Sequence, residues 1–197
     1  MSRVVLGIDG SYTRTGCGIW VDGRVSTWSI QTSKKDTHPQ RRAQIIRESL
    51  GRLGQIEQSW PWRGGQGTLI VIEAVHLLHG KQLGRVPLDL AMLFGAIVDA
   101  AHWRGIPVAA PEPSQVKSFA TGKGNASKDA MVMAARADLG IVPANHDEAD
   151  GAWLAAMGVY RHGGEFPNAS VPPADRLADI YDWKGWPSEP SLGWLAA

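Results

Sequence analysis

Cysteine is almost absent from this chain of 197 residues, since Cys17 is the only one. A single cysteine cannot form an intrachain disulfide and is typical of a reducing compartment. We interpret it as a small buried residue of a glycine-rich strand, without a reactive role. No apolar stretch approaches the roughly 18 residues that a membrane span requires, and a signal-peptide layout is missing. We therefore expect a soluble, cytoplasmic protein with no membrane partner.

Net charge is also nearly absent, at +1, which by itself does not suggest a nucleic-acid-binding protein. The charge is unevenly distributed along the chain, however. Residues 143–197 contain three Lys or Arg and eight Asp or Glu, which leaves 17 basic and 11 acidic residues for positions 1–142. The larger, N-terminal part of the chain is therefore basic and could bind a polyanion.

What the chain does contain is an ordered alternation of strands and helices. The β-branched runs at 4–9 and 69–73 are typical of strands that are buried on both faces of a sheet. Asp22-Gly23 predicts a tight turn between two further strands. The predicted strands are 4–9, about 17–21, 24–31, 69–73 and 107–110, and the predicted helices are 39–58, 87–103, 114–119 capped by Ser114, 128–138 capped by Ser127, and one that contains residues 147–157.

This order predicts an α/β fold with a mixed five-stranded sheet, in which three antiparallel strands are followed by two parallel ones and helices cover both faces. It is the architecture of ribonuclease H-like domains. The composition changes after residue 162, where glycine and proline become frequent and Trp183, Trp186 and Trp194 occur. We expect one domain at 1–162 and an arm at 163–197 that packs on the domain or on a partner subunit.

Four acidic residues lie at positions where the predicted elements should bring them together. Asp9 and Glu73 each end a predicted parallel strand, so both side chains should leave the same edge of the sheet. Asp147 and Asp150 are three residues apart and share one face of a helix, which Leu154 continues as an apolar stripe toward the sheet. We therefore expect all four carboxylates to meet at the sheet.

Crowded carboxylates favour a divalent cation. Two like charges about 4 Å apart repel by about 4 kcal/mol at an effective dielectric constant near 20. Oxygen ligands without cysteine favour Mg²⁺, with Mn²⁺ expected to substitute, and two such ions can activate water and stabilise the leaving oxygen of a phosphodiester. Taken singly, Asp9 could cap a turn, Glu73 could end its strand in solvent, and Asp147 or Asp150 could favour a helix N-terminus.

Basic residues occur near the same predicted segments. We expect Lys117, Lys123 and Lys128 to contact phosphate, and Lys81 and Arg85, which should also lie near the acids, to bind DNA. Arg47 and Arg52 are better interpreted as a solvated helix face, because charge runs usually do no more than solvate.

Five segments together form a recognisable pattern: Gly7 to Ser11, Thr15 to Gly18, Ile72 to Val75, Val116 to Lys128, and Pro143 to Ala155. They resemble, in the same order, the RuvC family of Holliday junction resolvases. The resemblance implies a nuclease domain at 1–162 that cuts branched DNA, four-way junctions foremost, in paired symmetric nicks. It also implies that the four acids are the metal ligands, that Lys117 and catalytic Lys128 lie near the DNA backbone, and that the protein is a homodimer. The apolar helix at 87–103 is our candidate for the dimer contact.

Some positions depart from that family's pattern. His76 stands where bacterial members carry an aromatic residue thought to wedge into the junction, and a histidine stacks on a base less strongly. Glu148 replaces a small residue between the last two acids and is expected to face away from the metals. His146, beside them, could assist proton transfer or simply cap the helix. These departures suggest a diverged, phage-type member.

Three alternatives remain at this point. The first is a nuclease of the same chemistry that also cuts forks and flaps. The second is a non-catalytic junction-binding protein, which the presence of all four acids opposes. The third is an ATP-binding protein similar to actin or the sugar kinases, since Gly7 to Ser11 also resembles their phosphate-binding turn, but 197 residues leave no room for the second domain that they need.

Overall fold

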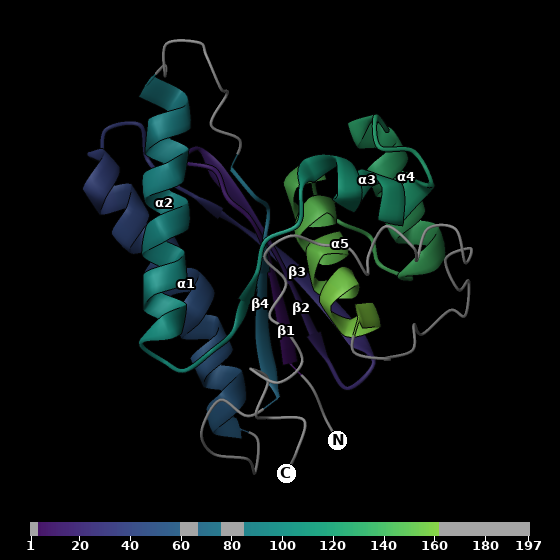
Figure 1. Ribbon diagram of the computed structural model, residues 1–197, viewed down its shortest axis with the longest axis horizontal. Helices are drawn as coiled ribbons and strands as arrows, with labels where there is room; N and C mark the ends of the chain where they lie inside the picture. The colour runs from purple at the N-terminus through teal and green to yellow at the C-terminus, as the bar shows by residue number, and fades with distance from the viewer. Residues whose placement is uncertain (1–3, 60–66, 76–84, 162–197) are drawn as a thin grey trace.

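Five strands and five helices are found in the computed structural model, which describes residues 4–59, 67–75 and 85–161 (Figure 1). The strands are β1 (Val4–Asp9), β2 (Arg14–Val21), β3 (Arg24–Gln31), β4 (Thr68–Ile72) and β5 (Val108–Ala109). The helices are α1 (His38–Ser59), α2 (Arg85–His102), α3 (Pro113–Thr121), α4 (Lys128–Asp138) and α5 (His146–Arg161).

The strands form one mixed sheet in the order β3-β2-β1-β4-β5. β2 pairs antiparallel with both β1 and β3, and β4 pairs parallel with both β1 and β5. Asp22 and Gly23, with φ angles of 45° and 79°, form the tight turn between β2 and β3. The predicted fold class, with three antiparallel strands followed by two parallel ones, is confirmed.

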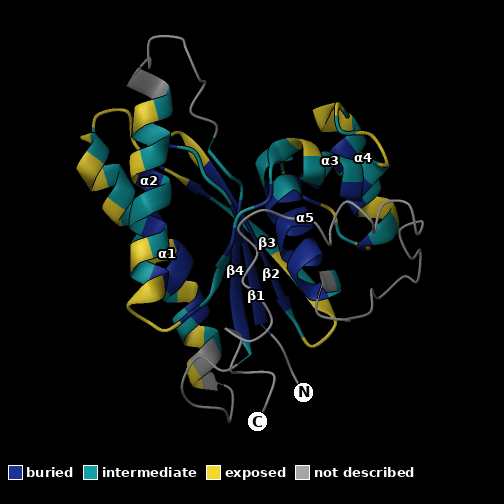
Figure 2. Ribbon diagram, viewed as in Figure 1, coloured by how far each residue is buried: buried dark blue, intermediate teal, exposed yellow. Residues whose placement is uncertain are grey.

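Helices cover both faces of the sheet. In Figure 1, α1 and α2 lie on one side, and α5 lies on the other with α3 and α4 outside it. Alternate residues of β1 divide between two buried clusters: Leu6 and Ile8 pack with residues of α1 and α2, whereas Val5 packs with residues of α5. Figure 2 shows the consequence, since the central strands and α5 are buried while the outer helices have exposed faces.

Several boundaries differ from those predicted. β2 begins at Arg14, three residues earlier than expected, because Arg14 still pairs with Gln31 of β3. β4 ends at Ile72, so Glu73 lies one residue beyond the strand.

The cap predicted for the third helix is also wrong. α3 starts at Pro113, where the Gln115 side chain accepts a hydrogen bond from the backbone N–H of Glu112 at 2.9 Å. Ser114 is therefore inside the helix, which continues past Phe119 to Thr121. Ser127 does cap α4, since its hydroxyl accepts from the backbone N–H of Ala130.

The tryptophans divide between core and surface. Trp20 and Trp153 are buried, whereas Trp103, just after α2, is 88% exposed in the single chain. α2 buries Leu93 and Ile97 against the sheet and exposes other apolar residues, among them Leu88. Its use as a dimer contact remains a prediction.

The predicted arm at 163–197, and with it the predicted domain boundary, lies outside the described residues. Among the helices of the described part, none combines the length and the apolar character needed to cross a membrane. Cys17 is a buried free thiol, as expected from its place in the strand, and burial raises its pKa well above the ordinary value.

Candidate active site

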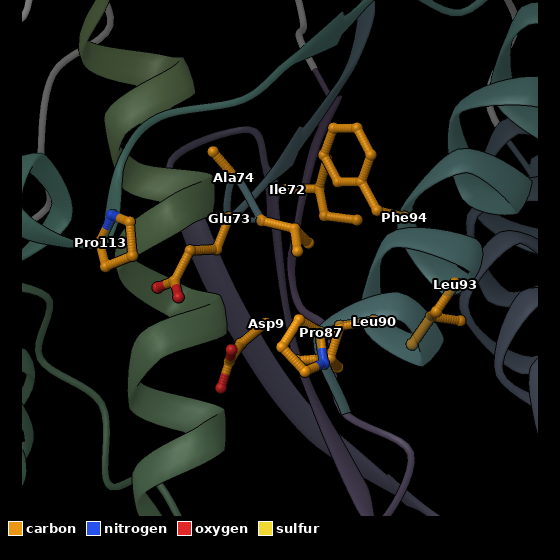
Figure 3. A pocket seen from close by; sticks show the side chains of 11 residues that line it. Asp9, Ile72, Glu73, Ala74, Pro87, Leu90, Leu93, Phe94 and Pro113 are labelled. Carbon is orange, nitrogen blue, oxygen red and sulfur yellow. The ribbon is translucent and has the colours of Figure 1, made fainter. Parts of the chain in front are cut away.

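Asp9 and Glu73 are neighbours at one edge of the sheet. β1 and β4 run parallel with Ile8 opposite Ile72, so the next residue of each strand is an acid. The backbone N–H of Glu73 donates to the carbonyl of Ile8 at 3.3 Å, which continues the pairing past the end of β4. Figure 3 shows the two carboxylates side by side and directed to the same side of the strands. This placement was predicted from the two apolar runs.

The other two acids come from the first turns of α5. Asn145 fixes the start of this helix, because its side-chain oxygen accepts a hydrogen bond from the backbone N–H of Glu148 at 3.0 Å. Asp147 and Asp150 follow on the face that packs toward β1 and β2, where Leu154 is fully buried as the predicted stripe requires.

Glycines let α5 approach the sheet closely enough to deliver these acids. A Cβ atom on Gly16 of β2 would lie 1.8 Å from the backbone oxygen of Asp147, and one on Gly7 of β1 would lie 2.2 Å from that of Gly151. Neither position can hold a side chain unless the helix moves away. The backbone that carries Asp147 therefore rests directly on the strand next to Asp9.

Burial and the charges of neighbouring acids raise the pKa values of two of these acids. Burial raises the pKa of Asp9 well above its ordinary value, and the charges of Glu73, Asp150 and Asp147, in that order, raise it further. Burial also raises the pKa of Asp150 to about 6, an increase to which Asp147 contributes. The four predicted acids are thus brought into one negatively charged site.

Two of the predicted lysines face this site. The positive charge of Lys128, at the start of α4, opposes the rise in the pKa of both Asp9 and Asp150. Lys117 of α3 does the same for Asp150. Lys123 lies in the loop between α3 and α4, and its predicted contact with phosphate stays a prediction.

Arg14 is a member of the site that the sequence analysis did not identify. Its Nε atom donates a hydrogen bond to Oδ2 of Asp147, and the two side chains form an ion pair. Arg14 falls between the strands predicted at 4–9 and about 17–21, where no periodic pattern indicates the direction of a side chain. Once β2 is known to begin there, Arg14 falls on the same face as Gly16 and Gly18, which is the face that α5 covers.

Glu148 faces away from the other acids, as predicted, and is buried against β3. Its carboxylate accepts hydrogen bonds from four donors: the Thr27 hydroxyl at 2.9 Å, the Ser29 hydroxyl at 3.3 Å, the Ala144 backbone N–H at 3.1 Å and the Asn145 side-chain amide at 3.3 Å. These contacts join the start of α5 to the outer strand. Glu148 therefore helps to fix the direction in which Asp147 and Asp150 point.

A cavity of about 210 Å³ opens beside Asp9 and Glu73 (Figure 3). Its far wall is apolar and comes from α2, with Pro87, Leu90 and Phe94 facing the acids across it. The site therefore has a charged side on the sheet and α5 and an apolar side on α2.

The structure says less about the remaining predicted site residues. His76 and Lys81 lie outside the described residues, as does the side chain of Arg85. His146 is the first residue of α5, and its Nε2 lies 3.8 Å from Oδ1 of Asp129 on α4. Its charge also opposes the rise in the pKa of Asp150, so it is near the acids, and its role stays a prediction.

The donor set fits a hard divalent cation, because it consists of carboxylate oxygens, and burial together with the neighbouring acids raises the pKa of Asp9 and Asp150. Within 4–59, 67–75 and 85–161, however, no group of three Asp, Glu, His or Cys side chains is already arranged to hold a metal ion. Asp147 is turned to Arg14 instead. To hold a metal ion, these acids would need a local adjustment of their side chains.

Comparison with known proteins gives consistent results. The chain is 31% identical over 169 residues to the crossover junction endodeoxyribonuclease RuvC of Chlorobium phaeovibrioides, covering 82% of this chain and 83% of that protein. It is 40% identical over 168 residues to the protein of the same name from Anaeromyxobacter sp., covering 85% and 78%. No family model matches the chain.

Solved structures agree on the fold. Thermus thermophilus RuvC superposes with a TM-score of 0.61 at 24% identity, covering 81% of this chain and 96% of that one. The same protein in complex with a Holliday junction substrate gives a TM-score of 0.60 at 21% identity, covering 82% and 96%. The expected phage-type origin stays a prediction. The sequence identity to curated relatives, over most of both chains, shows that this chain belongs to the RuvC family.

Proposed function

We propose that this protein is a Mg²⁺-dependent endonuclease that resolves Holliday junctions by hydrolysing phosphodiester bonds. The observation that carries the proposal is the meeting of Asp9 and Glu73, from adjacent parallel strands, with Asp147 and Asp150 of α5, in a chain that belongs to the RuvC family. Membership of this family leaves the ATP-binding alternative without support.

The four carboxylates would hold the divalent ions, which supply an activated water and stabilise the leaving oxygen when bound. The residues of the chain supply the remaining parts of the chemistry. Glu148 and Asn145 hold the start of α5 so that Asp147 and Asp150 face the sheet. Lys128 and Lys117 place positive charge beside the acids, where they would position the DNA backbone.

The substrate class follows from the relatives. The curated relatives are named crossover junction endodeoxyribonucleases, and Thermus thermophilus RuvC has been seen with a Holliday junction substrate. A two-fold symmetric homodimer would place two identical sites on two strands of a nearly symmetric junction, which is the physical reason to expect paired nicks.

A substrate panel tests this proposal. Labelled four-way junction, replication fork, flap, linear duplex and single strand are incubated with the protein with and without Mg²⁺. We expect symmetric paired nicks in the four-way junction, only with the metal, and little cutting of duplex or single strand. Equal cutting of junction, fork and flap would instead favour the broader branched-DNA nuclease, for which the replacement of the wedge aromatic by His76 is the sequence evidence. No cutting of any branched DNA would contradict both.

A further inference from the structure

Arg14 lies where a strand meets the carboxylate cluster. It is the first residue of β2 and points to the same face as Gly16, the position at which that strand lies against the backbone of Asp147. Its Nε donates to Oδ2 of Asp147. The Arg14 side chain is 44% exposed and that of Asp147 is 15% exposed, so the arginine reaches the site from its open side.

The ion pair removes from the cluster one of the oxygens that a cation would need. A guanidinium is always protonated and only donates hydrogen bonds, so it cannot share a metal with Asp147. Lys117 and Lys128 act differently, because their charges oppose the rise in the pKa of Asp150 and do not engage Asp147 in an ion pair that the structure resolves. In the described part of the chain, Arg14 is therefore the cation that competes for this ligand.

A DNA phosphate is a suitable alternative partner for the same guanidinium. Arginine binds phosphate oxygens through two parallel N–H groups, with a geometry similar to that of its pairs with carboxylates. Arg14 is nearly half exposed at the rim of the site, so its side chain can turn outward without disturbing packing. The scissile strand must run past the same acids if they are to act on it.

We propose that Arg14 is a built-in counter-ion that holds Asp147 until DNA binds, and that a backbone phosphate then draws it away and frees Asp147 for the divalent ions. This inference rests on the proposed function and adds to it a coupling between the binding of the cation and the binding of DNA. Cation and DNA each favour the form in which the Arg14–Asp147 pair is open, so each should tighten the binding of the other.

The first test measures divalent-ion binding without DNA. Mn²⁺ is titrated calorimetrically into the wild type, Arg14→Gln, Arg14→Lys and Arg24→Gln, with folding of each checked by thermal unfolding. Arg24 is an exposed arginine at the opposite end of the β2–β3 hairpin and serves as the matched control. We expect Arg14→Gln to bind Mn²⁺ about three- to ten-fold more tightly. Arg14→Lys should fall between it and the wild type, and Arg24→Gln should match the wild type.

The second test separates a specific counter-ion from a general effect of removing charge. The affinity for a labelled four-way junction is measured with EDTA and with Ca²⁺. The counter-ion model predicts that Ca²⁺ tightens junction binding in the wild type by about the factor gained in the first test, and that this coupling is largely lost in Arg14→Gln. If Arg14→Gln acted only by removing positive charge from the site, the ratio of the junction affinities with Ca²⁺ and with EDTA would be the same in both proteins.

The outcomes are distinguishable from failure of the proposed function. Equal Mn²⁺ affinity of Arg14→Gln and wild type, or an unchanged effect of Ca²⁺, would overturn the counter-ion model even if the wild type cuts junctions. Absence of Mn²⁺ binding in every variant would overturn both the model and the metal site. Tighter Mn²⁺ binding together with lost coupling supports the model whether or not the preferred substrate is a four-way junction.

Discussion

Ionisation of a buried acid in this site destabilises the folded protein. Asp150 has a pKa raised to about 6, mainly by burial, against an ordinary value of 3.8. In the unfolded chain it loses its proton near pH 4, whereas in the folded protein it keeps it up to about pH 6. The folded state is therefore penalised in full above pH 6, and the penalty is relieved as the pH falls from 6 to 4.

Asp150→Asn should accordingly stabilise the metal-free protein at pH 7.5 by about 1–3 kcal/mol and have little effect at pH 4. Urea unfolding at the two pH values measures this difference. Asp99→Asn, an exposed change on α2, is the control and should shift neither curve by more than about 0.5 kcal/mol. A destabilised Asp150→Asn at pH 7.5 would show that the ionised Asp150 does not destabilise the folded protein.

Glu148 illustrates a different use of a buried acid. Its carboxylate accepts hydrogen bonds from four donors. Glu148→Gln replaces one acceptor oxygen by an NH₂ group, so donors on β3 or just before α5 lose their acceptor. We expect a loss of about 1–3 kcal/mol in the free energy of unfolding.

The matched control for this change is Glu48→Gln, at a largely exposed position on α1. Urea denaturation of the two variants should place nearly all of the loss in Glu148→Gln. Equal, small effects would mean that these hydrogen bonds do not anchor α5.

At the scale of single residues, the sequence was sufficient for the acids and insufficient for their partners. Asp9 and Glu73 follow β-branched runs, and Asp147 and Asp150 share a helical spacing, so pattern alone predicts that they meet. No such pattern marks Arg14. The strand that orients it, β2, was predicted from its apolar part, which begins about three residues after Arg14. The direction of Glu148 was predicted from its helical position, but its donors on β3 required the tertiary structure.

At the scale of elements, the contact of α5 with β1 and β2 positions the site. Gly16→Ala would place a methyl group against the backbone of Asp147 and force the helix outward. We expect a loss of about 1–3 kcal/mol in stability, as for overpacking in a core, together with a lower cleavage rate.

Gly54→Ala provides the control, because a Cβ there meets nothing within 4 Å and the position is inside α1. That substitution should be neutral or stabilise the protein by up to about 1 kcal/mol. Thermal unfolding and junction cleavage of both variants test the argument, and a harmless Gly16→Ala would contradict the close contact.

Most elements could be predicted, and the errors have physical causes. Apolar period and the Asp22-Gly23 turn located the sheet, and Ser127 located the start of α4. The start of α3 was missed because the Gln115 side chain caps it together with Glu112, while a serine at the next position gave a simpler but wrong signal. The close contact of α5 with the sheet depends on glycines of different elements that face each other, such as Gly7 and Gly151. The sequence of one segment alone does not show that they meet.

At the scale of the whole molecule, the distribution of charge should govern binding to DNA. A small net charge conceals a basic N-terminal part, from which Lys117 and Lys128 face the acids. Junction affinity should therefore fall steeply with salt. Lys117→Gln should reduce the slope of log K against log salt by about 0.7–0.9.

Arg47→Gln, an exposed change on α1, should leave that slope unchanged. Junction affinity is measured by fluorescence anisotropy at salt concentrations from about 50 to 200 mM, a range in which the salt dependence of DNA binding is large. A salt slope that is the same in Lys117→Gln and the wild type would remove Lys117 from the DNA contact.

The central claim is that four carboxylates from three separate parts of the chain act as one cation-dependent cleavage site. Asp147→Asn and Asp150→Asn, each compared with Asp99→Asn, test it in one experiment that records junction binding and junction cleavage in Mg²⁺. The account predicts that both site variants bind the four-way junction with at least wild-type affinity and cut it at least about 100-fold more slowly, a loss of about 2.7 kcal/mol or more in transition-state stabilisation. Cleavage at the wild-type rate by either variant would contradict it.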